Sequence, residues 1–135
     1  MRKLSAILTI SSAALVASTL AGCSSSAPTS TNLVGTWSGN YAFPSVTNGV
    51  EKSPLTITIS RQEGPLLWGT ETWVDKGKTL KADLVGSLAP EGNQVTLAIA
   101  GGSFNGFVQD NAMSLQFVLT LDPPTAFYVT LTKQE

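Results

Sequence analysis

Few residues of this chain could do chemistry, and their types exclude most catalytic sites. The sequence contains no His and a single Cys, Cys23. Nucleophilic sites that pair Ser or Cys with His are therefore excluded, as is every zinc site that needs a His ligand. We expect no enzymatic activity, no cofactor and no bound metal.

Paired carboxylates are the remaining route to acid–base catalysis, but most of the nine acidic residues fall in turns or tails. Glu71 and Asp83 lie within predicted strands, where solvated acids are far commoner than buried ones. Glu71 is the most informative of them because it stands between Trp68 and Trp73. In an extended segment Glu71 and Trp73 share one face, and Trp68 lies on the other.

The two orientations of this segment predict different interiors. If Glu71 and Trp73 face inward, a polar anchor lies beside an aromatic wall, as in many ligand pockets. Trp37, Tyr41, Glu71 and Trp73 are then the candidate ligand-binding residues. If Trp68 faces inward, the interior is apolar packing and Trp73 is an exposed aromatic that contacts a partner or a membrane surface. We favour this second orientation by a small margin.

The N-terminus has the order of a secretory signal. Residues 1–3 are positively charged at Arg2 and Lys3, residues 4–20 carry no charge, and Ala21 and Gly22 are small. A retained transmembrane anchor is the alternative, but a spanning helix needs about 20 mostly apolar residues, and six Ser and Thr residues dilute this stretch. We therefore predict that residues 1–22 are a cleaved signal peptide.

Leu20-Ala21-Gly22-Cys23 resembles the lipobox of bacterial lipoproteins. The resemblance implies that the Cys23 thiol takes a diacylglycerol and that the leader is cut before this residue. An ordinary buried thiol fits less well, because Cys23 precedes a run of Ser outside any apolar pattern. Several acyl chains would hold the protein stably on a membrane. The predicted location is the cell envelope, at the periplasmic face of the outer membrane if the host is Gram-negative.

The remainder divides into a tether and one domain. Residues 23–32 are small and polar, which predicts a flexible lipidated tether; residues 33–135 are long enough for one domain. Loss of Arg2 and Lys3 would make the formal charge of −1 more negative by two. This weak charge and the lack of a basic cluster exclude a nucleic-acid partner, and we expect a monomer.

Alternation with a period of two predicts that this domain is all-β. The apolar residues of Leu55-Thr56-Ile57-Thr58-Ile59 share one face, and the same holds for residues 95–99 and 129–132. Turn residues separate eight candidate strands, although Asn105-Gly106 could itself form a hairpin turn. The predicted strands are 33–43, 54–62, 66–74, 78–88, 94–100, 103–109, 113–121 and 126–133.

Short connections favour an antiparallel up-and-down meander, and closing eight strands into a barrel removes both unpaired edges. A transmembrane barrel is the alternative, but Thr, Ser and Lys fill most of the second faces, which suits water. We expect an interior formed mainly by aliphatic and aromatic side chains. Its members are Trp37, Tyr41, Leu55, Ile57, Ile59, Leu80, Leu84, Leu88, Val95, Leu97, Ile99, Phe104, Leu115, Phe117, Leu119, Phe127, Val129 and Leu131.

Gly35-Thr36-Trp37, followed by this meander, resembles the opening strand of calycin-type barrels, the lipocalins and avidins. The resemblance implies that Trp37 points inward and that a late basic residue, here Lys133, packs on it; a half-exposed Trp of a sandwich strand is the alternative. Gly69-Thr70-Glu71-Thr72-Trp73 occupies the place of a biotin-contacting run in avidins. Because Glu71 and Trp73 replace the residues expected there, biotin binding is not predicted.

Two functions follow. The first is a membrane-anchored barrel that binds a small apolar ligand. The second is a non-catalytic interaction or inhibitor lipoprotein that meets an envelope protein or polymer through its outer face, with a packed barrel as scaffold. Some exported metalloprotease inhibitors are barrels of this second kind.

Overall fold

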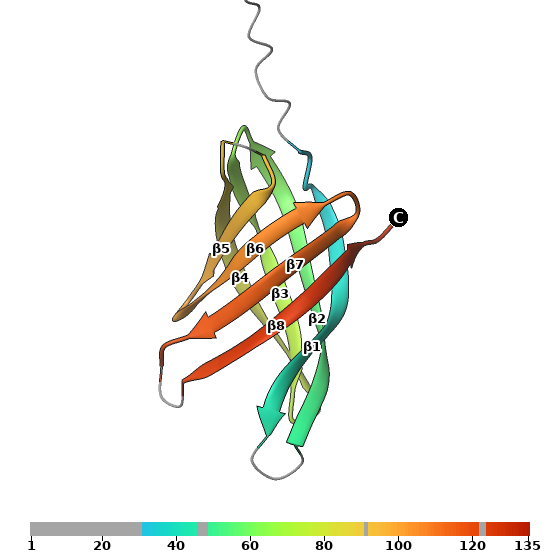
Figure 1. Cartoon of the computed structure of the whole chain (residues 1–135), viewed down its shortest axis with the longest axis vertical. Coiled ribbons are helices and arrows are strands. Elements are labelled where there is room, and N and C mark those ends of the chain that lie inside the picture. Colours follow the sequence, from blue (N-terminus) through green and yellow to red (C-terminus); the bar gives the residue numbers. More distant parts are fainter. Residues whose placement is uncertain (1–30, 46–48, 91, 122–123) are drawn as a thin grey trace, which may run out of the picture.

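The chain folds as a closed antiparallel barrel in which every element is paired with its neighbours in sequence (Figure 1). The computed structural model describes residues 31–45, 49–90, 92–121 and 124–135, so the predicted signal peptide and Cys23 lie outside the described residues. No helix among these residues is long and apolar enough to cross a membrane. The strands are β1 (Gly35–Ser45), β2 (Gly49–Glu63), β3 (Leu66–Asp75), β4 (Lys78–Leu88), β5 (Gln94–Ile99), β6 (Gly102–Gln109), β7 (Ala112–Leu119) and β8 (Thr125–Lys133).

This architecture confirms the predicted all-β, eight-stranded barrel. β2 shows why the sequence specifies it: Leu55, Ile57 and Ile59 are buried, whereas Thr56 and Thr58 between them are half-exposed. One face of each strand thus enters the core, and the other meets water. Closure pairs β1 with β8, so that Trp37 lies opposite Lys133.

Glycines on the inner face let the strands curl tightly. A Cβ atom on Gly69 would overlap the carbonyl oxygen of Thr58 on β2, and one on Gly106 would overlap the carbonyl oxygen of Ser114 on β7. The backbones approach closely at these points, as glycine in a strand often indicates. Gly106 therefore belongs within β6, and the alternative hairpin turn at Asn105-Gly106 is wrong.

The upper end of the barrel, as drawn in Figure 1, is sealed by the residues that precede and open β1. Leu33 and Trp37 are fully buried, and the Trp37 Nε1–H donates to the Leu33 carbonyl oxygen at 2.9 Å. The Leu33 N–H in turn donates to the Gln62 side chain at 2.8 Å. The Lys133 ammonium lies 5.4 Å from the centre of the Trp37 ring. The predicted inward Trp37 and its contact with Lys133 are both confirmed.

Most of the predicted interior is buried, but four of its members are only partly buried and Leu80 is exposed. Leu80 shares the inward row of Leu84 and Leu88, but it is 38% exposed. Leu80 lies near the start of β4, beyond the part of this strand that β5 covers. β5 pairs with β4 only from Val85 to Leu88, so no β5 side chain covers Leu80. Prediction also missed four apolar members of the core, Leu33, Leu67, Val108 and Met113.

The strand boundaries differ from prediction mainly at β2. This strand begins at Gly49 rather than at residue 54 and runs through Pro54, which pairs with Asn40 of β1. Pro44, Lys52 and Pro54 gave this hairpin the composition of a loop. The ladder tolerates a Pro wherever its missing N–H is not needed by a neighbouring strand.

Candidate ligand site at the lower end of the barrel

Burial decreases along the barrel axis from the upper end to the lower end. On β3, Leu67 is 1% exposed and Glu71 3% exposed, whereas Trp73 is half-buried and Asp75 is exposed. The other inward side chains near the lower ends of their strands follow the same trend. They pack against the core but are only partly buried: Tyr41, Ile99, Leu119 and Phe127.

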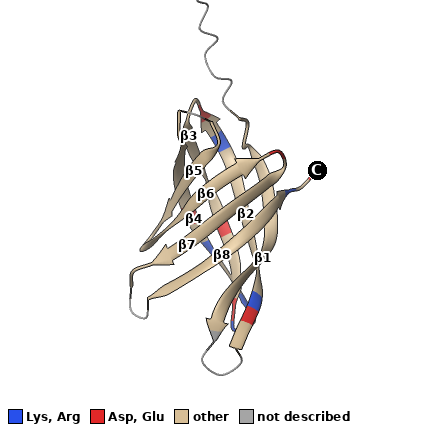
Figure 2. Ribbon diagram, viewed as in Figure 1, with Lys and Arg blue, Asp and Glu red and all other residues tan. Residues whose placement is uncertain are grey.

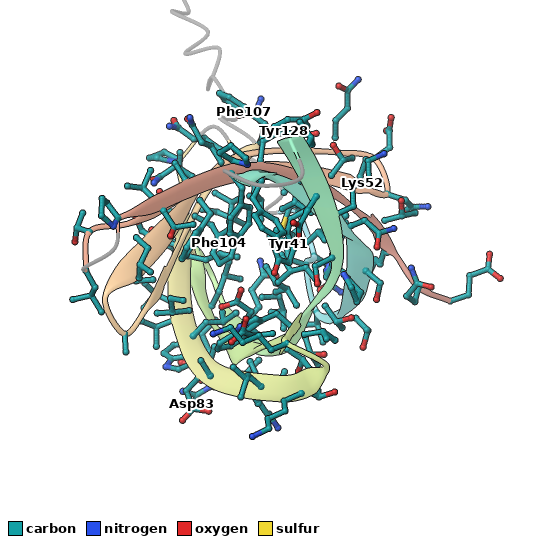
Figure 3. All side chains as sticks on the ribbon, turned by 90° about the horizontal axis from the view of Figure 1, so that it is seen from below. Tyr41, Lys52, Asp83, Phe104, Phe107 and Tyr128 are labelled. Carbon is teal, nitrogen blue, oxygen red and sulfur yellow. The ribbon has the colours of Figure 1, made fainter. Side chains whose placement is uncertain are left out.

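Aromatic rings form a continuous cluster in this lower half. The Tyr41 ring stacks on Phe127 with centroids 4.4 Å apart, and Phe127 stacks on Phe117 at 4.7 Å. Phe117 contacts Phe104 at 4.5 Å, and Phe43 lies 5.5 Å from Tyr41 towards the rim. Figure 3, which looks at the molecule from below, shows Tyr41 and Phe104 inside the barrel. The cluster therefore extends from the core to the partly exposed end.

Glu71 is the one buried polar or charged side chain among the described residues. It lies opposite Ile57 of β2 and Ala82 of β4, and neither side chain can offer a hydrogen bond. Its Oε2 atom has no hydrogen-bond partner. Desolvation by burial raises the pKa of this carboxyl from 4.5 to about 7, because an apolar environment disfavours the charged form.

The inward face of β3 is opposite to the one we favoured from the sequence. Glu71 and Trp73 face the interior, whereas Trp68 lies outside beneath the Arg61 guanidinium, 3.9 Å from its ring centre. A β-bulge between Ile59 and Arg61 is the cause. A two-residue turn after Glu63 joins β2 to β3 and pairs Glu63 with Leu66. If the pairing continued from there without a bulge, Ile59 would lie opposite Thr70.

The extra residue of the bulge, Ser60, shifts this register by one position, so that Ile59 lies opposite Gly69. A shift of one residue exchanges the two faces of a strand. The prediction that Trp73 is an exposed aromatic is therefore wrong. Trp73 is half-buried and packs against the core.

The structure places the four candidate ligand-binding residues at different heights of the barrel. Tyr41 and Trp73 are half-buried towards the lower end, Trp37 is part of the upper seal, and Glu71 lies between these levels, opposite Ile57, which also pairs with Trp37. Phe127, which the sequence indicated only as a core residue, is partly buried and stacked on Tyr41. Its position two residues into β8, on the face of Val129 and Leu131, is the signal that could have placed it here.

The outer wall has a feature that the sequence analysis did not identify. Among the described residues, the outward side chains of β5, β6, β7, β8 and β1 include no charged group. We call this surface the charge-free wall. In Figure 2, β5, β6 and β7 are uncoloured along their lengths. The ion pair on the opposite wall joins Arg61 and Glu63 at 3.5 Å.

Two large side chains project from the charge-free wall. Phe107 is 59% exposed and Tyr128 is 68% exposed, and Figure 3 shows both on the outside of the barrel. A shallow apolar hollow of about 380 Å³ lies beside Tyr128, between β1 and β8. Another, of about 640 Å³, is bordered by Phe107 and Thr132.

Comparisons with known proteins support the fold alone. No protein-family model matches the chain, and no curated protein matches its sequence. A solved structure of a redesigned β-barrel is similar with a TM-score of 0.58 and 12% identity, over 76% of this chain and 92% of that one. The crystal structure of Rv2717c from M. tuberculosis matches with a TM-score of 0.44 and 14% identity, over 76% of this chain and 93% of that one.

Proposed function

We propose that this protein is an exported lipoprotein, anchored to a membrane through Cys23, whose barrel binds a small and mainly apolar molecule at its lower end. The observation that carries the ligand proposal is the unpartnered Oε2 atom of Glu71, in a carboxyl that is 3% exposed. A buried polar group without a partner costs about 1–3 kcal/mol. A carboxyl with a strongly raised pKa inside a barrel is also a candidate functional group on physical grounds.

The surroundings of Glu71 have the composition of a small-molecule site. Such sites are lined mostly by apolar and aromatic side chains and contain few polar groups. Tyr41, Trp73 and Phe127 are partly buried aromatic residues that pack against the core at this end, and Glu71 is the buried polar side chain of the described residues. A ligand that covered these rings would shield their apolar surface from water. A donor group on the same ligand would give the carboxylate the hydrogen bond that it lacks.

Anchoring rests on the lipobox-like Leu20-Ala21-Gly22-Cys23 and on the polar residues that follow it. The chain enters the barrel at its upper end, where Leu33 is buried over the core. The candidate site is at the opposite end. A tether attached to the upper end would therefore not block the candidate site at the lower end.

Native mass spectrometry on protein purified from its host membrane tests both parts of this proposal. We expect a chain that begins at Cys23 and carries lipid, together with a second mass from a bound molecule that is absent from Glu71→Gln. An intact chain with a free Cys23 thiol would refute anchoring. A lipidated chain that carries no molecule and binds no apolar probe would refute the ligand site.

The charge-free wall supports a second candidate function, recognition of an envelope protein. Protein interfaces are depleted of charged residues and enriched in aromatic ones at their centres, and Phe107 and Tyr128 are the exposed aromatic side chains of this wall. A photo-crosslinker at Tyr128 should then give one discrete adduct in the host, whereas one at Asp83, outside the wall, should not. Equal labelling from both positions would argue against this function.

A further inference from the structure

Among the residues that the structure describes, no group around Glu71 could neutralise a carboxylate. The side chains that face it from the neighbouring strands are Ile57 and Leu55 of β2 and Ala82 and Leu84 of β4, all of them apolar. On β3 itself the inward neighbours are Gly69 and Trp73.

The titratable groups of the inward rows lie elsewhere. Tyr41 is in the aromatic cluster, Glu51 is half-buried opposite Phe43 near the lower end of β2, and Asp75 and Lys78 are exposed at the β3–β4 turn. Lys133 is at the upper end, where its ammonium donates to the Asn32 carbonyl oxygen at 3.2 Å. The described residues therefore supply no charge that could match an ionised Glu71.

We propose that the ligand carries a protonated nitrogen, an ammonium group on an apolar body, which donates to Oε2 of Glu71. This inference rests on the function proposed above and names the ligand's chemical class. A hydroxyl group could also donate to this oxygen, but it would leave a buried carboxylate without a counter-charge, and buried charges are stable only when they are paired. A ligand carboxylate would be repelled. An ammonium group supplies both the hydrogen bond and the charge, and such charge-assisted bonds are roughly twice as strong as neutral ones.

The aromatic side chains of the lower end favour the same ligand class. Tyr41, Trp73 and Phe127 are partly buried there, and the faces of such rings attract cations within about 6 Å. The rings also provide the apolar contact that the body of the ligand needs. A cationic head at Glu71 with an apolar body among these rings therefore satisfies the whole site.

Three probes with one carbon skeleton test this inference: phenylbutylamine, phenylbutanol and phenylbutyrate. Their affinities would be measured by calorimetry at about pH 8, above the raised pKa of Glu71. We expect the amine to bind roughly tenfold more tightly than the alcohol, because only the amine brings a counter-charge to the buried carboxylate. The carboxylate should bind least. Amide NMR shifts should place the amine among Tyr41, Glu71 and Trp73.

Two variants separate the ammonium contact from general apolar binding. Glu71→Gln should remove the preference for the amine over the alcohol, whereas Glu63→Gln, on the outer face, should preserve it. Equal affinities for amine and alcohol, or an amine preference that survives Glu71→Gln, would overturn this inference while leaving an apolar site in place. Failure of all three probes to bind would instead overturn the proposed function.

Discussion

Replacing Glu71 by Gln should stabilise the unliganded barrel at neutral and alkaline pH and leave it unchanged in acid. Burial raises the pKa of Glu71 from 4.5 to about 7 in the folded protein, so between these values the folded state binds the proton more tightly than the unfolded state. The free energy of unfolding therefore falls as the pH rises through this window. Below it the carboxyl is protonated in both states and contributes no difference; above it the full cost of burying a carboxylate is present.

The size of this effect follows from the shift. One pKa unit corresponds to about 1.4 kcal/mol, so a rise from 4.5 to about 7 predicts a cost of about 3 kcal/mol above the window. Glu71→Gln removes the ionisable group but keeps its shape. The variant should gain about 3 kcal/mol over the native protein at alkaline pH. In melting temperature this is on the order of 10 °C for a domain of this size.

Urea unfolding of both proteins across the pH range measures the difference directly, because ionisations common to the two cancel. Glu63→Gln is the matched control: its carboxylate lies on the outer wall in an exposed pair with Arg61, and exposed pairs contribute at most about 1 kcal/mol. If the unfolding free energies of the native protein and Glu71→Gln run parallel from acid to alkaline pH, the carboxyl is not desolvated as described and the reasoning is wrong.

Two further predictions concern the fold. Trp37→Ala removes a ring that is 1% exposed and its hydrogen bond at the upper seal, so the free energy of unfolding in urea should fall by about 3–5 kcal/mol. Leu80→Ala, at a 38% exposed position, should lower it by less than about 1 kcal/mol. Similar losses in the two variants would contradict the sealed upper end. Gly106→Ala places a methyl group against the carbonyl oxygen of Ser114 and should lower the melting temperature more than Gly77→Ala, where φ is +76° but no atom lies within 4 Å. The reverse order would show that backbone conformation, rather than close approach of strands, makes glycine necessary.

Alternation predicted the strands because most of them have one clearly apolar face, and the short connections together with the cost of unpaired edges predicted the barrel. In β2 the buried Ile57 alternates with Thr56 and Thr58, and a sheet can bury only one of these sets. The sealed upper end was predictable in part, since the inward Trp37 and its basic neighbour followed from a resemblance. Leu33 was missed as a core residue although it shares the inward face of Trp37 in the predicted strand 33–43.

The candidate site could not be predicted in the same way, because both faces of β3 are plausible on composition. One face offers Trp68 and Val74 with two Thr residues; the other offers Leu67, Glu71 and Trp73. Register decides between them, and the register depends on one residue inserted 11 positions before Glu71, the bulge at Ser60.

Bulges insert a residue without a strong sequence signal and shift the pairing on one side only. If Ser60 were instead paired in the ladder, opposite Gly69, the same β3 would direct Trp68 and the Thr side chains inward and turn Glu71 to the water, where a carboxylate needs no partner. The bulge thus imposes on this barrel a buried acid that its packing does not require. The cost of burying a carboxylate falls on Glu71 alone, two residues from the half-buried Trp73. Recognition of the proposed ligand explains this buried acid better than the stability of the fold does.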